Sequence, residues 1–126
     1  MNQNIRILIV DNQSRARQSM KALLNTWYPN AEVREATNGM EAIQLTEEFM
    51  PHLILMDARM PILNGIEATK LIKAKQPQIK IVVLSMYSEF ETEALSEGAD
   101  SFINKSDLPE RLRETLIDIT NKNFQK

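Results

Sequence analysis

Several polar residues of this sequence directly follow short apolar runs. They are Asp11, Asn12, Asp57, Ser85 and Lys105. Two carboxylates, an amide, a hydroxyl and an ammonium can together hold Mg²⁺ and a phosphoryl group, because Mg²⁺ prefers one or two carboxylates with water and phosphate oxygens. For any one of these residues an ordinary polar loop is the simpler interpretation. Their recurrence after four separate runs instead predicts a single site for phosphoryl chemistry.

The apolar runs that would position these side chains are typical of buried strands, since they are continuous and rich in β-branched residues. One run, over residues 31–36, carries three charged residues and is expected at an edge of the sheet. The five predicted strands cover residues 5–10, 31–36, 53–56, 79–84 and 101–104.

Segments with helical period lie between and after these strands. Asn38 and Asn64 are the expected N-caps of a second and a third helix, and Gly98 is the expected end of a short fourth helix. Asp107 followed by Glu110 resembles a capping box at the start of a fifth helix. The first helix is predicted from apolar residues spaced by three and four: Ala16, Met20, Leu23, Leu24 and Trp27.

Strands that alternate with helices through short connections predict an α/β fold. Its sheet would be mainly parallel, with right-handed crossovers and helices on both faces. The carboxyl ends of the strands in such a sheet form one rim, and ligands bind there where the strand order reverses. We therefore expect the polar residues that follow the strands to converge.

The composition excludes several other classes of protein. A length of 126 residues allows one domain, and 15 basic against 17 acidic residues lack the excess of a self-sufficient nucleic-acid binder. The lack of cysteine excludes disulfides and thiolate sites, and three glycines are too few for a glycine-rich phosphate loop. No apolar run approaches the ~20 residues that span a bilayer, so we expect a cytoplasmic protein without membrane contact. His52, the single histidine, is expected at the surface.

One spaced motif runs through the predicted strand ends. It consists of Asp-x-x-Met-Pro from Asp57, followed by Gly65, with Ser85 and Lys105 further along the chain. On this motif and on residues 7–11 and 102–105, nearly the whole chain resembles the receiver domain of bacterial two-component response regulators. Ser106 after the lysine is similar to the NarL/FixJ branch, which is LuxR-type. The resemblance implies a CheY-like, flavodoxin-like (βα)5 fold, a doubly wound three-layer sandwich with parallel strand order 2-1-3-4-5.

The resemblance also implies a phosphoryl-transfer site. Asp57 would be the phosphoacceptor, taking a phosphoryl group from the phosphohistidine of a sensor histidine kinase. Lys105 would pair with Asp57 and then with a phosphoryl oxygen. Mg²⁺ would be the cofactor, held by Asp11, Asp57 and the backbone carbonyl of Arg59, with Asn12 acting through a water molecule.

The remaining implied roles concern switching and access. Ser85 would bind another phosphoryl oxygen, and Phe102 would follow it inward as the aromatic switch. These movements would change a partner-binding surface on the fourth helix, fifth strand and fifth helix. For Phe102, ordinary core packing is an equal alternative. Met86 and Tyr87 would control access to the phosphoryl site, and the bulk of Met86 predicts a long-lived phosphoaspartate.

Asn12 departs from the family pattern, which usually has two consecutive acidic residues after the first strand. We expect the missing carboxylate to weaken Mg²⁺ binding by about 1 kcal/mol net, or about tenfold, and phosphorylation to survive. Less repulsion around Asp57 is also expected to favour an active-like state without phosphate.

Three function classes follow from these observations. The leading hypothesis is a signalling receiver that catalyses only its own phosphorylation and dephosphorylation and is therefore not a turnover enzyme. The second is a pseudo-receiver, a stand-alone binding module that works without phosphorylation, which Asn12 favours. The third is a flavodoxin or an aspartate-nucleophile phosphatase. It is disfavoured, because a flavodoxin would have a Ser/Thr/Gly-rich first loop and a phosphatase would have an aspartate where Gln13 stands.

The length also bears on domain organisation. We expect one receiver domain over residues 1–126, with no output domain in this chain. A DNA-binding output domain of a longer regulator would then control transcription and provide the only contact with DNA, and the alternative is a receiver that works alone. A homodimer is a further expected partner state on phosphorylation.

Overall fold

Strands and helices alternate along the described chain. The structure is a computed structural model that describes residues 4–123. Two short 3₁₀ turns, Ser88–Phe90 and Lys105–Asp107, precede the last two helices. The strands are β1 (Arg6–Val10), β2 (Glu32–Ala36), β3 (Leu53–Asp57), β4 (Lys80–Ser85) and β5 (Ser101–Asn104), and the helices are α1 (Ser14–Trp27), α2 (Gly39–Phe49), α3 (Gly65–Lys75), α4 (Glu91–Ser96) and α5 (Glu110–Asn123).

The strands form one parallel sheet in the order β2-β1-β3-β4-β5. This order confirms the predicted fold and places the charged strand β2 at an edge. Val10 pairs with Met56, Asp57 with Leu84, and Ser85 with Asn104, so the carboxyl ends of neighbouring strands lie nearly level. The rim expected from the sequence therefore exists.

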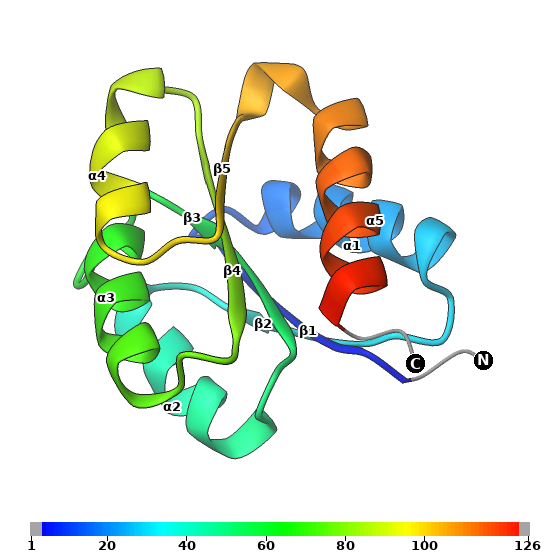
Figure 1. The fold of residues 1–126 in the computed structure, drawn as a ribbon, viewed down its shortest axis with the longest axis horizontal. Helices are drawn as coiled ribbons and strands as arrows, with labels where there is room; N and C mark the ends of the chain where they lie inside the picture. Colours follow the sequence, from blue (N-terminus) through cyan, green and yellow to red (C-terminus); the bar gives the residue numbers. More distant parts are fainter. Residues whose placement is uncertain (1–3, 124–126) are drawn as a thin grey trace.

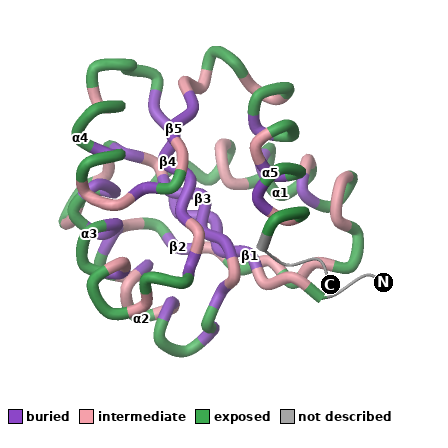
Figure 2. Tube along the Cα trace, viewed as in Figure 1, coloured by how far each residue is buried: buried purple, intermediate pink, exposed green. Residues whose placement is uncertain are grey.

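Helices cover both faces of the sheet, as Figure 1 shows. Helices α1 and α5 lie on one face, and α2, α3 and α4 lie on the other. Alternate residues of β1 enter separate cores, with Ile7 and Ile9 packed on the first side and Leu8 and Val10 on the second. The central strands are therefore buried along nearly their whole length (Figure 2), as expected for a parallel sheet covered on both faces.

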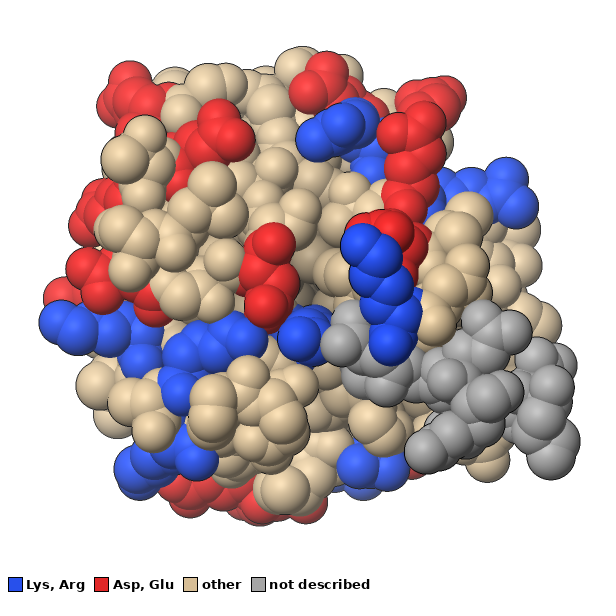
Figure 3. Space-filling view, viewed as in Figure 1, with Lys and Arg blue, Asp and Glu red and all other residues tan. Residues whose placement is uncertain are grey.

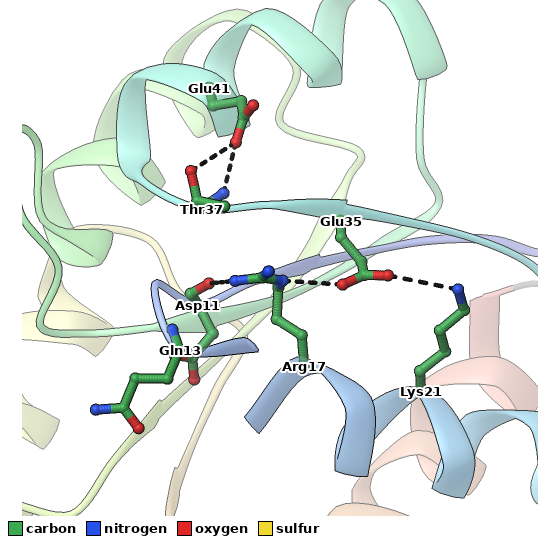
Figure 4. Close-up of polar contacts among 7 residues, drawn as sticks. All are labelled: Asp11, Gln13, Arg17, Lys21, Glu35, Thr37 and Glu41. Atoms are coloured by element: carbon green, nitrogen blue, oxygen red, sulfur yellow. Dashed lines mark hydrogen bonds and ion pairs between the residues drawn. The ribbon is translucent and has the colours of Figure 1, made fainter. Parts of the chain in front are cut away.

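Local capping chemistry fixes the start of two helices as predicted. The side chains of Asn38 and Asn64 accept hydrogen bonds from the backbone N–H groups of Glu41 and Glu67, at 2.9 Å each. Glu41 in turn accepts a hydrogen bond from the hydroxyl of Thr37 at 2.9 Å (Figure 4). The bonds accepted by Asn38 and Asn64 satisfy backbone N–H groups that a helix N-terminus leaves unpaired.

The structure corrects the predicted start of the fifth helix. Helix α5 begins at Glu110, and the carbonyl of Pro109 accepts its first hydrogen bond from Arg113 at 3.1 Å. Asp107 belongs to the preceding 3₁₀ turn and does not start the helix. The residue before a proline is driven toward extended conformations, and Leu108 is extended at φ −78° and ψ 150°. The capping-box interpretation of Asp107 is therefore wrong.

His52, predicted at the surface, is only partly exposed. It lies directly before β3, and its Nδ1 atom accepts a hydrogen bond from the backbone N–H of Arg6 at 3.0 Å. Burial lowers the pKa of His52, and the nearby positive charge of Arg6 lowers it further. His52 therefore connects β1 and β3 as a neutral acceptor.

The exposed charges are mixed on the face that Figure 3 shows. Acidic side chains gather over α4, whose first turn contains Glu91 and Glu93, and basic side chains form a band below them. Within residues 4–123, no helix is long and apolar enough to cross a membrane.

Candidate functional site

The predicted site residues meet at the carboxyl rim of the sheet. Asp57 and Ser85 are the last residues of β3 and β4, while Asp11 and Lys105 directly follow β1 and β5. Because β1, β3, β4 and β5 are consecutive neighbours in the sheet, their ends bring together residues that lie up to 94 positions apart in the sequence.

Lys105 binds both carboxylates of this rim. Its Nζ atom lies 2.7 Å from Oδ1 of Asp57 and 3.1 Å from Oδ2 of Asp11. The three side chains are largely shielded from solvent, with exposed fractions of 22% for Lys105, 12% for Asp57 and 10% for Asp11. Charge-assisted hydrogen bonds at these distances are strong. They fix the lysine between the two acids.

The pKa values of Asp57 and Lys105 are both raised at this site. Burial raises the pKa of the Asp57 carboxyl, the hydrogen bond and charge of Lys105 oppose that rise, and the charge of Asp11 adds to it. Burial alone would lower the pKa of Lys105, but its hydrogen bond with Asp57 and the charges of both acids outweigh burial and raise it. One lysine side chain therefore lies within hydrogen-bond distance of two aspartate side chains.

The oxygen atoms gathered here suit Mg²⁺. Carboxylate, carbonyl and water oxygens are the ligands that this ion prefers, and it needs no more than one or two carboxylates from the protein. Asp11 and Asp57 contact the same lysine nitrogen, so their oxygens face a common point. Across residues 4–123 no group of three or more histidine, cysteine, aspartate or glutamate side chains is placed to hold a metal ion. The carboxylates at this rim are therefore a pair.

Asn12 and Arg59 flank the acids on an open cavity of about 530 Å³. Both residues are exposed, and the cavity is also lined by Gln13, Asn64 and Glu93. The backbone N–H of Gln13 donates to Oδ1 of Asp11 at 2.9 Å, which fixes the carboxylate orientation. The amide of Asn12 thus lies beside a fixed carboxylate, where the family pattern has a second acid.

Gly65 allows α3 to begin directly against the backbone of Asp57. A Cβ atom at position 65 would overlap the carbonyl oxygen of Asp57. The N–H of Gly65 donates to the carbonyl of Ala58 at 2.9 Å, and the N–H of Ala58 donates to the carbonyl of Leu84 at 2.9 Å. This chain of bonds ties the segment after Asp57 to both α3 and β4.

The predicted switch residues lie on β4 and β5. Ser85 is 3% exposed, and its Oγ accepts a hydrogen bond from the backbone N–H of Tyr87 at 3.0 Å. Phe102 is 8% exposed and packs into the core on the side of α3 and α4. The ring of Phe102 is therefore already inside the protein in this structure.

The predicted access residues directly follow Ser85 at the end of β4 and are exposed. Met86 is 59% exposed and Tyr87 is 49% exposed. The guanidinium carbon of Arg59 lies 5.2 Å from the centre of the Tyr87 ring, within the range of a cation–π contact. This contact joins the loops that follow β3 and β4, which the sequence did not predict.

Arg17 is a residue beside the site that the sequence reasoning missed. Its guanidinium donates to the backbone carbonyl of Asp11 at 2.7 Å and to Glu35 at 2.9 Å. The available signal was its place in the first turn of a helix, where a basic side chain is unfavourable next to the helix dipole.

Comparisons with known proteins show which family and fold the chain resembles. Residues 7–117 match the family model of the response regulator receiver domain. The chain is 38% identical over 103 residues to the transcriptional regulatory protein LnrK of Bacillus subtilis, covering 80% of this chain and 47% of that protein. It thus spans about half the length of the curated relatives it matches.

Solved structures give the same result. A LuxR-family two-component response regulator from Aurantimonas sp. has a TM-score of 0.87 and 29% identity, over 96% of this chain and 88% of that one. The response regulator TrrA of Thermotoga maritima, in complex with Mg²⁺–BeF, has a TM-score of 0.84 and 30% identity, over 91% of this chain and 98% of that one.

Proposed function

The chain belongs to the response regulator receiver family, and we propose that it accepts a phosphoryl group on Asp57 from a sensor histidine kinase in a two-component system. The family membership confirms the resemblance to receivers with LuxR-type relatives. The observation that carries the proposal is the contact of Lys105 with both Asp57 and Asp11, at the rim where an α/β sheet binds ligands.

In the proposed reaction a carboxylate oxygen of Asp57 attacks the phosphorus atom of the donor phosphohistidine. A P–O bond forms and the P–N bond breaks, and its electron pair stays on the imidazole nitrogen, which then takes a proton from solvent. Lys105 already lies 2.7 Å from Asp57 and supplies positive charge where the phosphoryl oxygens gather charge. The chain modifies itself in this step, so we do not class it as a turnover enzyme.

Mg²⁺ is the proposed cofactor. When bound, it neutralises phosphoryl oxygens during transfer. Asp11, Asp57 and the backbone carbonyl of Arg59 would hold it, with Asn12 contributing through water. The response regulator TrrA of Thermotoga maritima is a complex with Mg²⁺–BeF, which supports the same cofactor here. Lys105 would keep its contact with Asp57 and lose its contact with Asp11, whose carboxylate would then bind the ion.

Ser85 is proposed to bind a second phosphoryl oxygen by donating its O–H, which is available while the Oγ atom accepts from the N–H of Tyr87. A shift of Ser85 toward the phosphoryl group would move the loop after β4 and alter the packing around Phe102. The surface formed by α4, β5 and α5 is then the one whose contacts change. Met86, together with the pair of Arg59 and Tyr87, is proposed to restrict access of water and small donors.

The proposed biological role is control of transcription, in the cytoplasm. LnrK is named a transcriptional regulatory protein, and the chain spans about half of it. We propose that residues 1–126 are a single receiver domain and that DNA is contacted only by an output domain outside this sequence. A homodimer would form on phosphorylation. A receiver that works alone is the alternative organisation.

Asn12 supports a second candidate, a pseudo-receiver that binds partners without phosphate. An exposed amide stands where relatives have a carboxylate, and its neutral side chain attracts a divalent cation less strongly. The intact pair of Asp11 and Asp57, and their contact with Lys105, favour the phosphorylated receiver over this alternative.

Beryllofluoride with Mg²⁺ separates these two candidates, because it mimics a phosphoryl group on an aspartate. Backbone amide NMR spectra of the wild type should shift along α4, β5 and α5 on its addition, and size-exclusion chromatography should report any dimer. The spectra of Asp57→Asn should stay unchanged. Identical responses of the two proteins, or none in the wild type, would support the pseudo-receiver.

A further inference from the structure

We infer that Arg17 is a positioning residue that orients Asp11 for the cation it would hold, acting through the backbone of Asp11. The inference rests on the proposed function, since it concerns the same site. Among residues 4–123, the hydrogen bonds of Arg17 go to the backbone carbonyl of Asp11 and to Glu35, and not to the carboxylate oxygens of Asp11 or Asp57. Arg17 reaches the site from α1.

The guanidinium group of Arg17 lies between Asp11 and Glu35 and donates a hydrogen bond to each (Figure 4). Its Nη1 atom donates to the carbonyl oxygen of Asp11 at 2.7 Å, and its Nε atom donates to Oε1 of Glu35 at 2.9 Å. The side chain is only 15% exposed. A planar guanidinium held at two edges has little freedom, so the peptide unit after Asp11 is fixed relative to β2.

Arg17 completes a set of contacts that leaves Asp11 one orientation. The N–H of Asp11 donates to the carbonyl of Ala36 at 3.1 Å, and Oδ1 of Asp11 accepts from the N–H of Gln13 at 2.9 Å. Oδ2 contacts Lys105. The backbone N–H, the backbone carbonyl and both carboxylate oxygens are thus all engaged. With Asn12 beside it, Asp11 is the only carboxylate of this loop, so its orientation decides how well the loop binds a cation.

The position of Arg17 in α1 argues against a role in stabilising the helix. The first turn of α1 contains no acidic residue, and the N-cap residue Gln13 makes no side-chain capping bond. Arg15 and Arg17 stand there instead, at the positive end of the helix dipole, where basic groups are disfavoured. Residues that oppose local preference are expected at functional sites.

Lys21 provides a matched control, because it pairs with the same glutamate. Its Nζ atom lies 3.4 Å from Oε2 of Glu35, and its side chain is 46% exposed. Figure 4 shows it on the far side of Glu35 from Asp11. The hydrogen bond from Arg17, more than that from Lys21, lowers the pKa of Glu35. Replacing either residue by methionine removes one positive charge near the site, but only Arg17→Met removes the hydrogen bond to the carbonyl of Asp11.

The loss of a charge and the loss of an orienting contact are therefore expected to change the affinity for Mg²⁺ in opposite directions. Loss of a nearby positive charge should tighten binding of a divalent cation. Loss of an orienting contact should weaken it, by about tenfold or more, as for other residues that support metal ligands. Arg17 is subject to both effects, whereas Lys21 is subject only to the first.

The test is Mg²⁺ titration of the unphosphorylated chain by isothermal titration calorimetry, with thermal unfolding of each variant. We expect Arg17→Met to bind Mg²⁺ about tenfold more weakly and Lys21→Met to bind it equally or slightly more tightly. Arg17→Gln, which keeps one donor group, should fall between the wild type and Arg17→Met.

Each other outcome has a defined meaning. Equal or tighter binding by Arg17→Met would overturn the inference and leave the proposed function standing. Failure of the wild type to bind Mg²⁺ would instead contradict the proposed function. Loss of the folded state in both Arg17 variants would assign Arg17 a structural role and overturn the inference as well.

Discussion

Lys105 and Asp57 form an ion pair of 2.7 Å across the carboxyl ends of β5 and β3, which are not neighbours in the sheet. The lysine reaches over the end of β4 to make it. The same ammonium lies 3.1 Å from Asp11. One lysine side chain thereby contacts two aspartates that are largely shielded from solvent, and this arrangement is the main support for the proposed phosphoryl-transfer site.

Asn12→Asp should strengthen Mg²⁺ binding. A second carboxylate on this loop adds attraction for the ion, which we expect to be worth about 1 kcal/mol net, or roughly five- to tenfold in affinity. Isothermal titration calorimetry measures the change. Gln13→Glu is the control, because it adds the same charge one residue further along the cavity wall. Equal gains from the two variants would show that charge alone, and not position 12, determines affinity.

Met86→Ala should shorten the lifetime of the phosphorylated state. Removing an exposed side chain next to Ser85 opens a path for water to the phosphoryl group. We expect hydrolysis to accelerate by about three- to tenfold, which corresponds to no more than about 1.4 kcal/mol of barrier. Loss of phosphoprotein after removal of the donor gives the rate. Leu95→Ala changes another exposed apolar side chain, on α4, and should leave the rate unchanged. A rate unchanged in Met86→Ala would remove Met86 from the access route.

Gly65→Ala should damage both stability and phosphorylation. The added methyl group would overlap the carbonyl of Asp57, and forcing extra atoms into a packed site costs about 1–3 kcal/mol. Urea denaturation measures the free energy of unfolding, and phosphoprotein yield measures the chemistry. Gly98→Ala also introduces strain, because Gly98 has φ +113°, but Gly98 precedes the amino end of β5, whereas the rim lies at the carboxyl ends of the strands. Its phosphorylation should be normal, and a similar defect in both variants would point to general destabilisation.

His52 should make the stability of the chain depend on pH. Burial, and to a lesser degree Arg6, lowers the pKa of His52 in the folded state, so the unfolded state binds the proton more readily. The free energy of unfolding should then fall as pH decreases from about 7 through the unfolded pKa toward the lower folded pKa. Urea denaturation at several pH values measures this slope.

His52→Asn is the matched variant for this measurement. An asparagine oxygen can replace Nδ1 as acceptor for the N–H of Arg6 but does not titrate in this range. As pH falls, the free energy of unfolding of the wild type should therefore decrease relative to that of His52→Asn. A difference that stays constant between about pH 7 and 5 would contradict a lowered pKa.

The fold followed from the sequence wherever local chemistry decides the structure. Asn38 and Asn64 act as caps because a side-chain oxygen satisfies a nearby N–H whatever the rest of the fold does. Asp107 looked equally suitable, but Pro109 forces its neighbour out of the helical conformation and moves the start of α5 to Glu110. Leu71 of α3 is 49% exposed although the neighbouring Ala68 and Ile72 are buried, since the width of a buried face depends on what packs against it.

The residues of the candidate site also differ in whether the sequence could predict them. Asp11, Asp57, Ser85 and Lys105 were predictable as a group, because strand ends of a parallel sheet share one rim. Arg17 was not, since its partners are a backbone carbonyl and a glutamate 18 residues away. The contact of Arg59 with Tyr87 joins two loops whose approach only the folded sheet determines.

The proposed function requires Asp57 to be the phosphoacceptor, and intact mass spectrometry tests this role most directly. The chain is incubated with acetyl phosphate and excess Mg²⁺, beside Asp57→Asn and a sample with chelator. We predict that only the wild type with Mg²⁺ gains the mass of one phosphoryl group. No gain in that sample, or an equal gain in Asp57→Asn, would contradict the assignment.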